Sequence, residues 1–241
     1  MNFYNAIAKY YEDIFPLGKD KLNFTLSELS TNTNSILDIG CATGSLCLNL
    51  PLKKQISGID LDDKMIEIAK DRAFKLKQNI NFQVMDMLTI NEHFSTNCFD
   101  VMFCFGNTIV HLQTPDKIEL FLKHVKHCLK PNGKFLVQLV NYDRILANKI
   151  TSLPLIDNKS IKFERNYNYP SNSKLIKFTT QLLIKETSLI LSNSIELYPL
   201  THSEFSSLAK NAGFSSIEFY GSFKKDTYKP KSSPGIIAVC Q

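Results

Sequence analysis

The hydrophobic and polar positions follow two alternating patterns along most of the chain. Short, nearly continuous apolar runs are typical of strands buried in a parallel sheet, and they lie at 35–39, 55–60, 80–85, 99–105 and 134–140. Apolar residues at helical spacing predict helices before or between these runs, at 4–15, 20–30, 63–77 and 115–129. This alternation of strand and helix predicts a doubly wound α/β fold with a mostly parallel sheet.

The last third of the chain departs from this pattern. Residues 161–197 alternate between apolar and polar positions, with turn-forming residues at 170–173 and 192–194. This pattern predicts an antiparallel β ribbon inserted in the sheet topology at 155–198. The pattern that follows predicts a helix and then two strands, at 201–211, about 214–220 and 235–240.

The composition is that of a globular domain. The chain of 241 residues is long enough for one α/β domain, so we expect residues 1–241 to form a single domain. It has no apolar run of about 18 residues and no secretory signal at its start, so we expect a cytoplasmic protein without a membrane segment. The net charge of +5 is modest and the lysines are scattered, which gives no reason to expect a nucleic-acid partner.

The cysteines and histidines give no metal signature. Six cysteines occur without a C-x-x-C pair, so we expect free thiols. His124 and His127 would share one face of a helix, but Lys123, Lys126 and Lys130 crowd the same stretch. Because added positive charge disfavours a metal ion, we expect no metal there.

The strongest candidate for chemistry is the turn after the first strand. Residues 37–44 read Leu-Asp-Ile-Gly-Cys-Ala-Thr-Gly, and Asp60 ends the next strand twenty residues after Gly40. Small residues let the backbone turn sharply and approach a ligand, and the carboxylate can accept hydrogen bonds from both hydroxyls of a ribose. The pattern therefore indicates a site for a nucleotide-type cofactor.

The spacing of this turn argues against a dinucleotide. A dinucleotide motif needs a glycine five residues after the first, where this chain has Ser45, and Asp38 would repel a pyrophosphate. A carboxylate at this place suits a cation. S-adenosyl-L-methionine carries an ammonium and a sulfonium group and no phosphate, so it is the cofactor that the turn favours.

With this turn the chain resembles the class I S-adenosylmethionine-dependent methyltransferases, and Ala42 replaces the middle glycine of their first motif. The resemblance covers nearly the whole chain and implies a seven-stranded Rossmann-like sheet with an antiparallel last strand. It also implies that Gly40 and Cys41 hold the amino-acid moiety above Asp38, while Asp60 binds the ribose. The expected cofactor contacts are Tyr11, Asp38, Gly40, Cys41, Gly44, Asp60, Phe105 and Gly106, with Leu61, Met65, Asp86 and Met87 at the adenine.

The loop after the fourth strand bears on the methyl acceptor. Residues 105–108 read Phe-Gly-Asn-Thr, and with His111 they resemble the small-molecule methyltransferases typified by glycine N-methyltransferase. The motifs of enzymes that methylate adenine, glutamine amides or RNA cytosine are missing here. The resemblance implies that Asn107 orients the nucleophile and that His111 binds the cofactor carboxylate or accepts a proton.

One departure from that group concerns the substrate. Those enzymes have an arginine that grips the substrate carboxylate where this chain has Val140. Arg144 or Arg165 would have to take its place, because a carboxylate without a cationic partner binds poorly. The departure therefore weakens the case for glycine as the acceptor.

Two segments are expected to cover the site. In many relatives the N-terminal helices, here residues 1–30, form a lid over the cofactor, to which Tyr11 would contribute. The ribbon would roof the substrate pocket. Alternatively, it would pair with a second copy in a homo-oligomer, because exposed strand edges invite pairing.

These features predict methyl transfer to a nitrogen or oxygen of a small-molecule acceptor. Such a transfer is an in-line displacement with a neutral leaving group, so the protein mainly supplies proximity and alignment. Two alternatives stay open at this point. One is an RNA- or protein-directed methyltransferase, and the other is a non-catalytic protein that binds S-adenosylmethionine.

Overall fold

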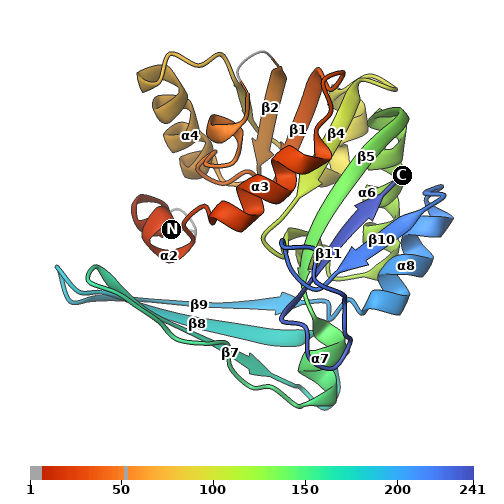
Figure 1. The fold of residues 1–241 in the computed structure, drawn as a ribbon. Helices are drawn as coiled ribbons and strands as arrows, with labels where there is room; N and C mark the ends of the chain where they lie inside the picture. Colours follow the sequence, from red (N-terminus) through yellow and green to blue (C-terminus); the bar gives the residue numbers. More distant parts are fainter. Residues whose placement is uncertain (1–6, 52–53) are drawn as a thin grey trace.

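The computed structural model describes residues 7–51 and 54–241, and its main feature is a seven-stranded sheet in the order β10-β11-β5-β4-β1-β2-β3 (Figure 1). Its strands are β1 (Ser35–Ile39), β2 (Gln55–Asp60), β3 (Asn81–Val84), β4 (Phe99–Cys104), β5 (Leu129–Val140), β10 (Ile217–Tyr220) and β11 (Gly235–Cys240). Strands β1 to β5 pair in parallel, whereas β11 is antiparallel to both β5 and β10. The mostly parallel sheet with an antiparallel last strand is thus confirmed.

The helices largely lie where the apolar spacing predicted them. They are α2 (Tyr11–Ile14), α3 (Lys19–Glu28), α4 (Asp63–Lys75), α5 (Ile90–His93), α6 (Pro115–Cys128), α7 (Tyr142–Ala147) and α8 (His202–Asn211). Residues 4–6 of the first predicted helix lie outside the described residues, and its remainder forms α2 after a 3-10 turn, η1 (Ala8–Tyr10). The sequence did not predict α5, α7 or the 3-10 turn η4 (Thr108–Leu112).

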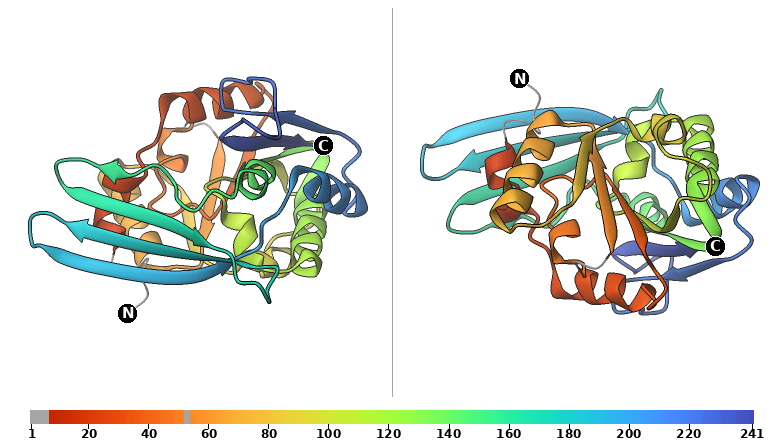
Figure 2. Two further views of the ribbon diagram at one scale, coloured as in Figure 1. Left: turned by 90° about the horizontal axis from the view of Figure 1, so that it is seen from below. Right: turned by 90° about the horizontal axis from the view of Figure 1, so that it is seen from above.

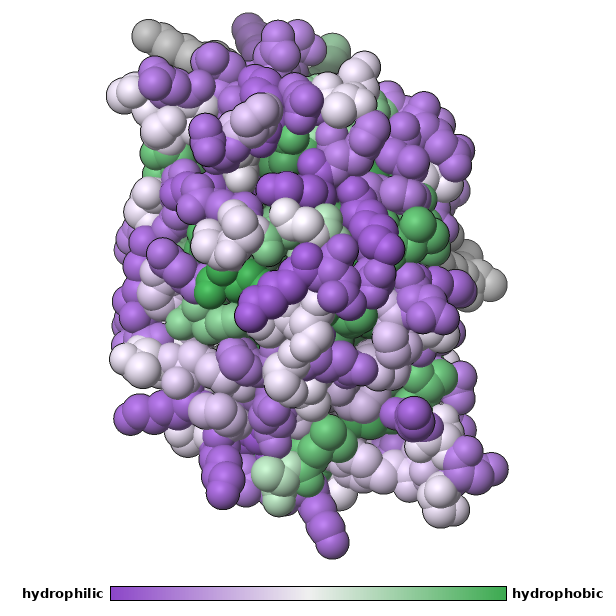
Figure 3. All heavy atoms as spheres, turned by 90° about the vertical axis from the view of Figure 1, so that its right-hand side faces the viewer, coloured by the Kyte–Doolittle hydropathy of each residue, from purple (hydrophilic) through white to green (hydrophobic). Residues whose placement is uncertain are grey.

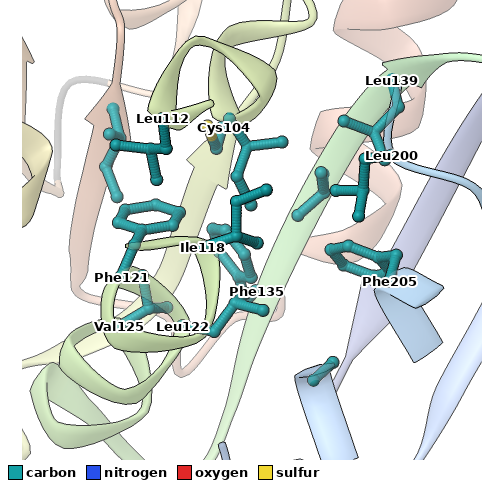
Figure 4. Close-up of a cluster of buried hydrophobic side chains, with 14 of the residues drawn as sticks. Cys104, Leu112, Ile118, Phe121, Leu122, Val125, Phe135, Leu139, Leu200 and Phe205 are labelled. Carbon is teal, nitrogen blue, oxygen red and sulfur yellow. The ribbon is translucent and has the colours of Figure 1, made fainter. Parts of the chain in front are cut away.

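Helix α6 covers β4 and β5 and forms much of the larger hydrophobic core, as Figure 4 shows. The helix begins after Thr114, whose hydroxyl accepts a hydrogen bond from the Lys117 N–H at 3.3 Å. Phe121 of α6 meets Phe135 of β5 edge to face, with ring centroids 5.9 Å apart. Because burying such a ring contributes about 1.5–3 kcal/mol, this core fixes the two strands and the loops at their carboxyl ends.

The predicted ribbon forms a separate antiparallel sheet, which lies below the main sheet in Figure 1 and in front of it in the left view of Figure 2. Its strands are β6 (Ile156–Asp157), β7 (Ile161–Asn168), β8 (Ile176–Ile184) and β9 (Leu189–Leu197). The turn predicted at 170–173 falls between β7 and β8, but the turn predicted at 192–194 is wrong, because these residues continue β9. They are polar because Ser192 and Ser194 face solvent while Asn193 faces a cavity.

The surface is mostly polar on the face drawn in Figure 3, where hydrophobic side chains occupy small, separate areas. In the described ranges, no helix has both the length and the apolar character that a membrane crossing requires. All six cysteines are free thiols, and five of them are buried.

Candidate functional site

Two adjoining cavities lie at the carboxyl ends of the central strands. The smaller one, which we name the sheet-edge cavity, has a volume of about 210 Å³ and contains Asp60 and Asp86 in its lining. The larger one, the ribbon cavity, has a volume of about 400 Å³ and extends from Asp38 to strands β7, β8 and β9. Both linings include Tyr11, Gly40, Ala42, Phe105, Gly106 and His111. The two cavities therefore form one continuous site.

The structure brings nearly all the predicted cofactor residues to this site. The sheet-edge cavity is lined by Tyr11, Gly40, Asp60, Leu61, Met65, Asp86, Met87, Phe105 and Gly106. Asp38 and Cys41 line the ribbon cavity. Gly44 lines neither cavity, and its position is explained by packing, because a side chain there would collide with Phe82.

The turn after β1 keeps the backbone close to both cavities. The N–H groups of Gly40 and Cys41 both donate to the Ile59 carbonyl, at 2.8 and 2.9 Å. Gly40 has a φ of +73°, and a Cβ at this residue would lie 2.8 Å from a methyl carbon of Thr108. Ala42 also adopts a positive φ, of +47°, where the resemblance implied a glycine. The turn thus requires glycine at residue 40 for both conformation and space.

The Asp60 carboxylate is held rigidly at the end of β2. One oxygen accepts from the Ala42 N–H at 2.9 Å, and the other accepts from the Asp62 N–H at 3.0 Å. Burial raises the pKa of this carboxyl above its ordinary value, and the two backbone donors oppose that shift. Because a carboxylate can accept about four hydrogen bonds, it retains capacity for a pair of hydroxyl groups.

Asp38 provides a second buried carboxylate, in the ribbon cavity. Its side chain is 4% exposed and accepts a hydrogen bond from the Cys47 thiol at 3.5 Å. Burial raises the pKa of Asp38 to about 6, although the positive charge of Lys21 opposes the shift. This carboxylate is poorly compensated, so a cationic ligand group would be bound favourably beside it.

Lys21 of α3 is a site residue that the sequence did not reveal. It lines the ribbon cavity, and its Nζ lies 5.3 Å from the centroid of the Phe105 ring. Burial lowers the pKa of Lys21, while the charges of Asp38 and Glu12 oppose that shift. A lysine and an aspartate at one end of the site match the opposite charges of an amino-acid moiety. A lysine in an N-terminal helix carries no local signal of this role.

A hydrogen-bond network ties the N-terminal segment to the turn. A Glu12 carboxylate oxygen accepts from the hydroxyls of Thr43 and Ser45 and from the Arg72 guanidinium, the last at 3.0 Å. The Arg72 Nη1 also donates to the Thr43 carbonyl at 2.9 Å. Tyr11, the neighbour of Glu12, lines both cavities. The network holds the N-terminal segment against the turn, and its action as a lid stays a prediction.

The two predicted catalytic residues lie in the ribbon cavity. The Asn107 amide oxygen accepts from the Val140 N–H at 3.0 Å, and its nitrogen donates to the Tyr142 hydroxyl at 3.0 Å. These bonds give Asn107 a positioning role between β4 and β5, and contact with a nucleophile stays a prediction. His111 is an exposed residue that borders both cavities, and partial desolvation lowers the pKa of its imidazole, which favours the neutral form at pH 7.

The expected adenine contacts surround the sheet-edge cavity. Met65 is 1% exposed and forms its floor, whereas Leu61 is 72% exposed at its rim. Asp86 accepts a hydrogen bond from the Leu88 N–H at 2.9 Å and so caps the 3-10 turn η3 (Met87–Thr89). Capping and cofactor binding are compatible, because the second carboxylate oxygen of Asp86 is not used by the cap.

A family model described as a methyltransferase domain matches residues 30–213. The chain belongs to this methyltransferase family. Because the match includes both β1 and β9, it covers the turn, the loop after β4 and the whole ribbon. Among solved structures with a similar fold, one is named as an S-adenosylmethionine-dependent methyltransferase and another as a methyltransferase with S-adenosylmethionine bound.

The chain is similar to curated methyltransferases and to a solved structure. It is 38% identical to phosphoethanolamine N-methyltransferase 1 of Arabidopsis thaliana over 104 residues, which are 42% of this chain and 20% of that protein. It is 25% identical to a ubiquinone biosynthesis O-methyltransferase of Coxiella burnetii over 122 residues, half of each chain. The chain thus spans at most half the length of these two relatives.

The solved structure of an S-adenosylmethionine-dependent methyltransferase from Clostridium acetobutylicum superposes with a TM-score of 0.83. The sequence identity is 17%, and the likeness covers 100% of this chain and 99% of that one. At this identity the likeness shows a common fold. It includes the whole ribbon, so the second sheet is part of that fold.

The residues present fit S-adenosylmethionine. The site offers a buried carboxylate and a lysine at one end, a carboxylate with free acceptor capacity in the middle, and apolar side chains at the other end. This order matches an amino-acid moiety, a ribose and an adenine. When bound, the cofactor supplies an electrophilic methyl group on a sulfonium.

The pKa of Asp38 gives a pH-dependent expectation. Because a cationic ligand binds only the charged carboxylate, affinity for S-adenosylmethionine should fall as the pH drops through about 6. Between pH 6 and pH 5 we expect a loss of roughly tenfold at most. Calorimetric titrations from pH 5 to pH 7 measure this profile, and Asp38→Asn should flatten it. A wild-type profile identical to that of Asp38→Asn would contradict the assignment.

Proposed function

We propose that this protein transfers the methyl group of S-adenosylmethionine to a nitrogen or oxygen atom of a small molecule. The observation that carries the proposal is the continuous pair of cavities, with most of the predicted cofactor contacts in one and the ribbon closing the other. A ribbon cavity of about 400 Å³ lies in the range of small-molecule sites. The names of the relatives, an N-methyltransferase and an O-methyltransferase of small metabolites, support the same class of acceptor.

In this proposal each group of residues has a separate task. Asp38 and Lys21 hold the charged amino-acid end of the cofactor, and Asp60 holds its ribose. The ribbon and the segment around Tyr11 exclude water and align the acceptor, which is the main contribution that an in-line displacement needs. His111, neutral at pH 7, accepts the proton that the acceptor loses.

We propose a cytoplasmic location, because free thiols at all six cysteines suit a reducing compartment.

The alternative to the ribbon as a roof over the substrate pocket is pairing with a second copy of the chain. A sedimentation measurement with and without S-adenosylmethionine would determine the oligomeric state.

The test is methyl transfer from labelled S-adenosylmethionine to three separate pools: small metabolites, total RNA and total protein. We expect label in the small-molecule pool only, and we expect its loss in Asp60→Ala. Label confined to RNA or protein would overturn the proposed acceptor class. Cofactor binding without label in any pool would instead indicate a non-catalytic binding protein.

A further inference from the structure

The ribbon carries one polar row between two apolar rows on the face that it turns toward the cavity. Arg165 of β7 pairs in register with Thr180 of β8, which pairs in turn with Asn193 of β9. Side chains at paired positions project to the same face of a sheet, and all three residues line the cavity. Neighbouring strands are about 4.8 Å apart, so the row extends across roughly 10 Å of the wall.

The flanking rows make this polar row conspicuous. On one side lie Phe163, Leu182 and Leu191, and on the other lie Tyr167, Phe178 and Ile195, each set joined by the same register. Apolar neighbours reduce the competition from water and strengthen electrostatic interactions at the row between them. A substrate group that contacts this wall therefore meets three polar side chains in an apolar surround.

Two atoms of the row are buried without a hydrogen-bond partner. Among the described residues, neither the Arg165 Nε nor the Thr180 hydroxyl has an acceptor or donor within reach, and Thr180 is only 6% exposed. An unsatisfied buried donor is costly, so its retention calls for a ligand or a water molecule. The two residues are direct neighbours across the strands, so a single group could satisfy both.

The guanidinium of Arg165 is oriented and lacks a counter-charge. Its Nη2 donates to the Pro154 carbonyl at 2.6 Å, and it lies 5.6 Å from the centroid of the Phe163 ring. Within the described part of the chain it forms no ion pair, and no acidic side chain lies on the ribbon wall of the cavity. Arg144, the other candidate from the sequence, does not line this cavity.

We propose that Arg165, Thr180 and Asn193 bind an oxyanion group of the methyl acceptor, a carboxylate or a phosphate. The inference rests on the proposed function and assigns the acceptor to the class of anionic small molecules. Arginine pairs with either anion through charged, directional hydrogen bonds, and the hydroxyl and the amide supply further donors. The row thus supplies the cationic contact to the substrate that the apolar side chain of Val140 cannot make.

The composition of the chain allows a direct test of the anion site. The protein has three arginines, at residues 72, 144 and 165, so nuclear magnetic resonance shows three Nε–H signals, and Arg165→Lys identifies one of them. Protein saturated with S-adenosylhomocysteine would be titrated with sodium acetate and with sodium phosphate, at an ionic strength held constant with chloride. We expect the Arg165 signal to shift saturably while the Arg72 and Arg144 signals stay in place. Whichever anion binds more tightly identifies the group as a carboxylate or a phosphate.

Matched variants test the neighbouring hydroxyl. Thr180→Val should weaken anion binding by roughly tenfold to 100-fold, the usual effect of one hydrogen bond to a charged group. Thr179→Val serves as its control, because Thr179 pairs with Asn166 on the other face of the ribbon and should leave binding unchanged. An Arg165 signal that moves with neither anion, or one that moves in parallel with the other two arginines, would overturn the proposal.

A second readout separates this inference from the proposed function. Arg165→Gln should raise the KM for the acceptor at least tenfold and leave the affinity for S-adenosylmethionine unchanged, because Arg165 belongs to the ribbon and none of the assigned cofactor contacts does. An unchanged KM would overturn the oxyanion row while the methyltransferase proposal stands. Failure of the unmutated protein to bind S-adenosylmethionine would instead refute the proposed function itself.

Discussion

Replacement of Asp60 by alanine should weaken the binding of S-adenosylmethionine by roughly 100-fold, or about 3 kcal/mol. The variant removes the carboxylate that would accept two hydroxyl groups of the ribose, and charge-assisted hydrogen bonds contribute about 1.5–3 kcal/mol each. Calorimetric titration of the purified variant measures this loss directly.

The matching control is Asp86→Ala. Asp86 lines the same cavity, but it is exposed and caps only a short 3-10 turn, so we expect a loss of less than about tenfold. Thermal unfolding of both variants separates binding from folding, because Asp60 also accepts hydrogen bonds from Ala42 and Asp62. A folded Asp60→Ala variant that binds with wild-type affinity would contradict the assigned ribose contact.

Replacement of Gly44 by alanine should destabilise the protein by about 2–4 kcal/mol. Gly44 has a φ of +75°, where an L-residue costs about 1–2 kcal/mol. Its Cβ would also lie 2.6 Å from the buried Phe82 ring, and overpacking of this kind costs about 1–3 kcal/mol. In a chain of 241 residues we expect the melting temperature to fall by roughly 5–15 °C, measured by circular dichroism.

Gly18→Ala is the control for this effect. Gly18 has a φ of −72°, and no atom lies within 4 Å of the position that an alanine Cβ would take there. Its free energy of unfolding should therefore change by less than about 0.5 kcal/mol. In a double-mutant cycle, Phe82→Leu should make Gly44→Ala less costly by relieving the collision. Equal stability of Gly44→Ala and wild type would show that the turn does not need glycine at this residue.

The parts of the fold that the sequence predicted are those with a local pattern. All five residues of β1 are buried, and three of them are large aliphatic residues, which makes the strand recognisable in the sequence. The apolar face of α6 repeats at helical spacing, and Thr114 and Pro115 mark its start in the sequence itself. The turn at Gly40 and the carboxylate at Asp60 belong to the same category, because their spacing alone sets their geometry.

The parts that were missed depend on contacts between distant residues. The Ser-Asn-Ser segment at 192–194 has turn-forming composition, yet it stays in β9 because nine residues of that strand pair with β8. Glu12 pairs with Arg72, which lies sixty residues further along the sequence, and no local pattern indicates such a pair. Arg165, Thr180 and Asn193 form a row only when the three strands pair in one particular register. The sequence alone does not define that register.

The most direct test of the central claim is a crystal structure of the protein with bound S-adenosylmethionine. We expect the ribose hydroxyls on Asp60, the amino-acid moiety between Asp38 and Lys21, and the sulfonium methyl group directed into the ribbon cavity. A cofactor bound outside these residues, or a methyl group that faces away from the ribbon cavity, would contradict the account.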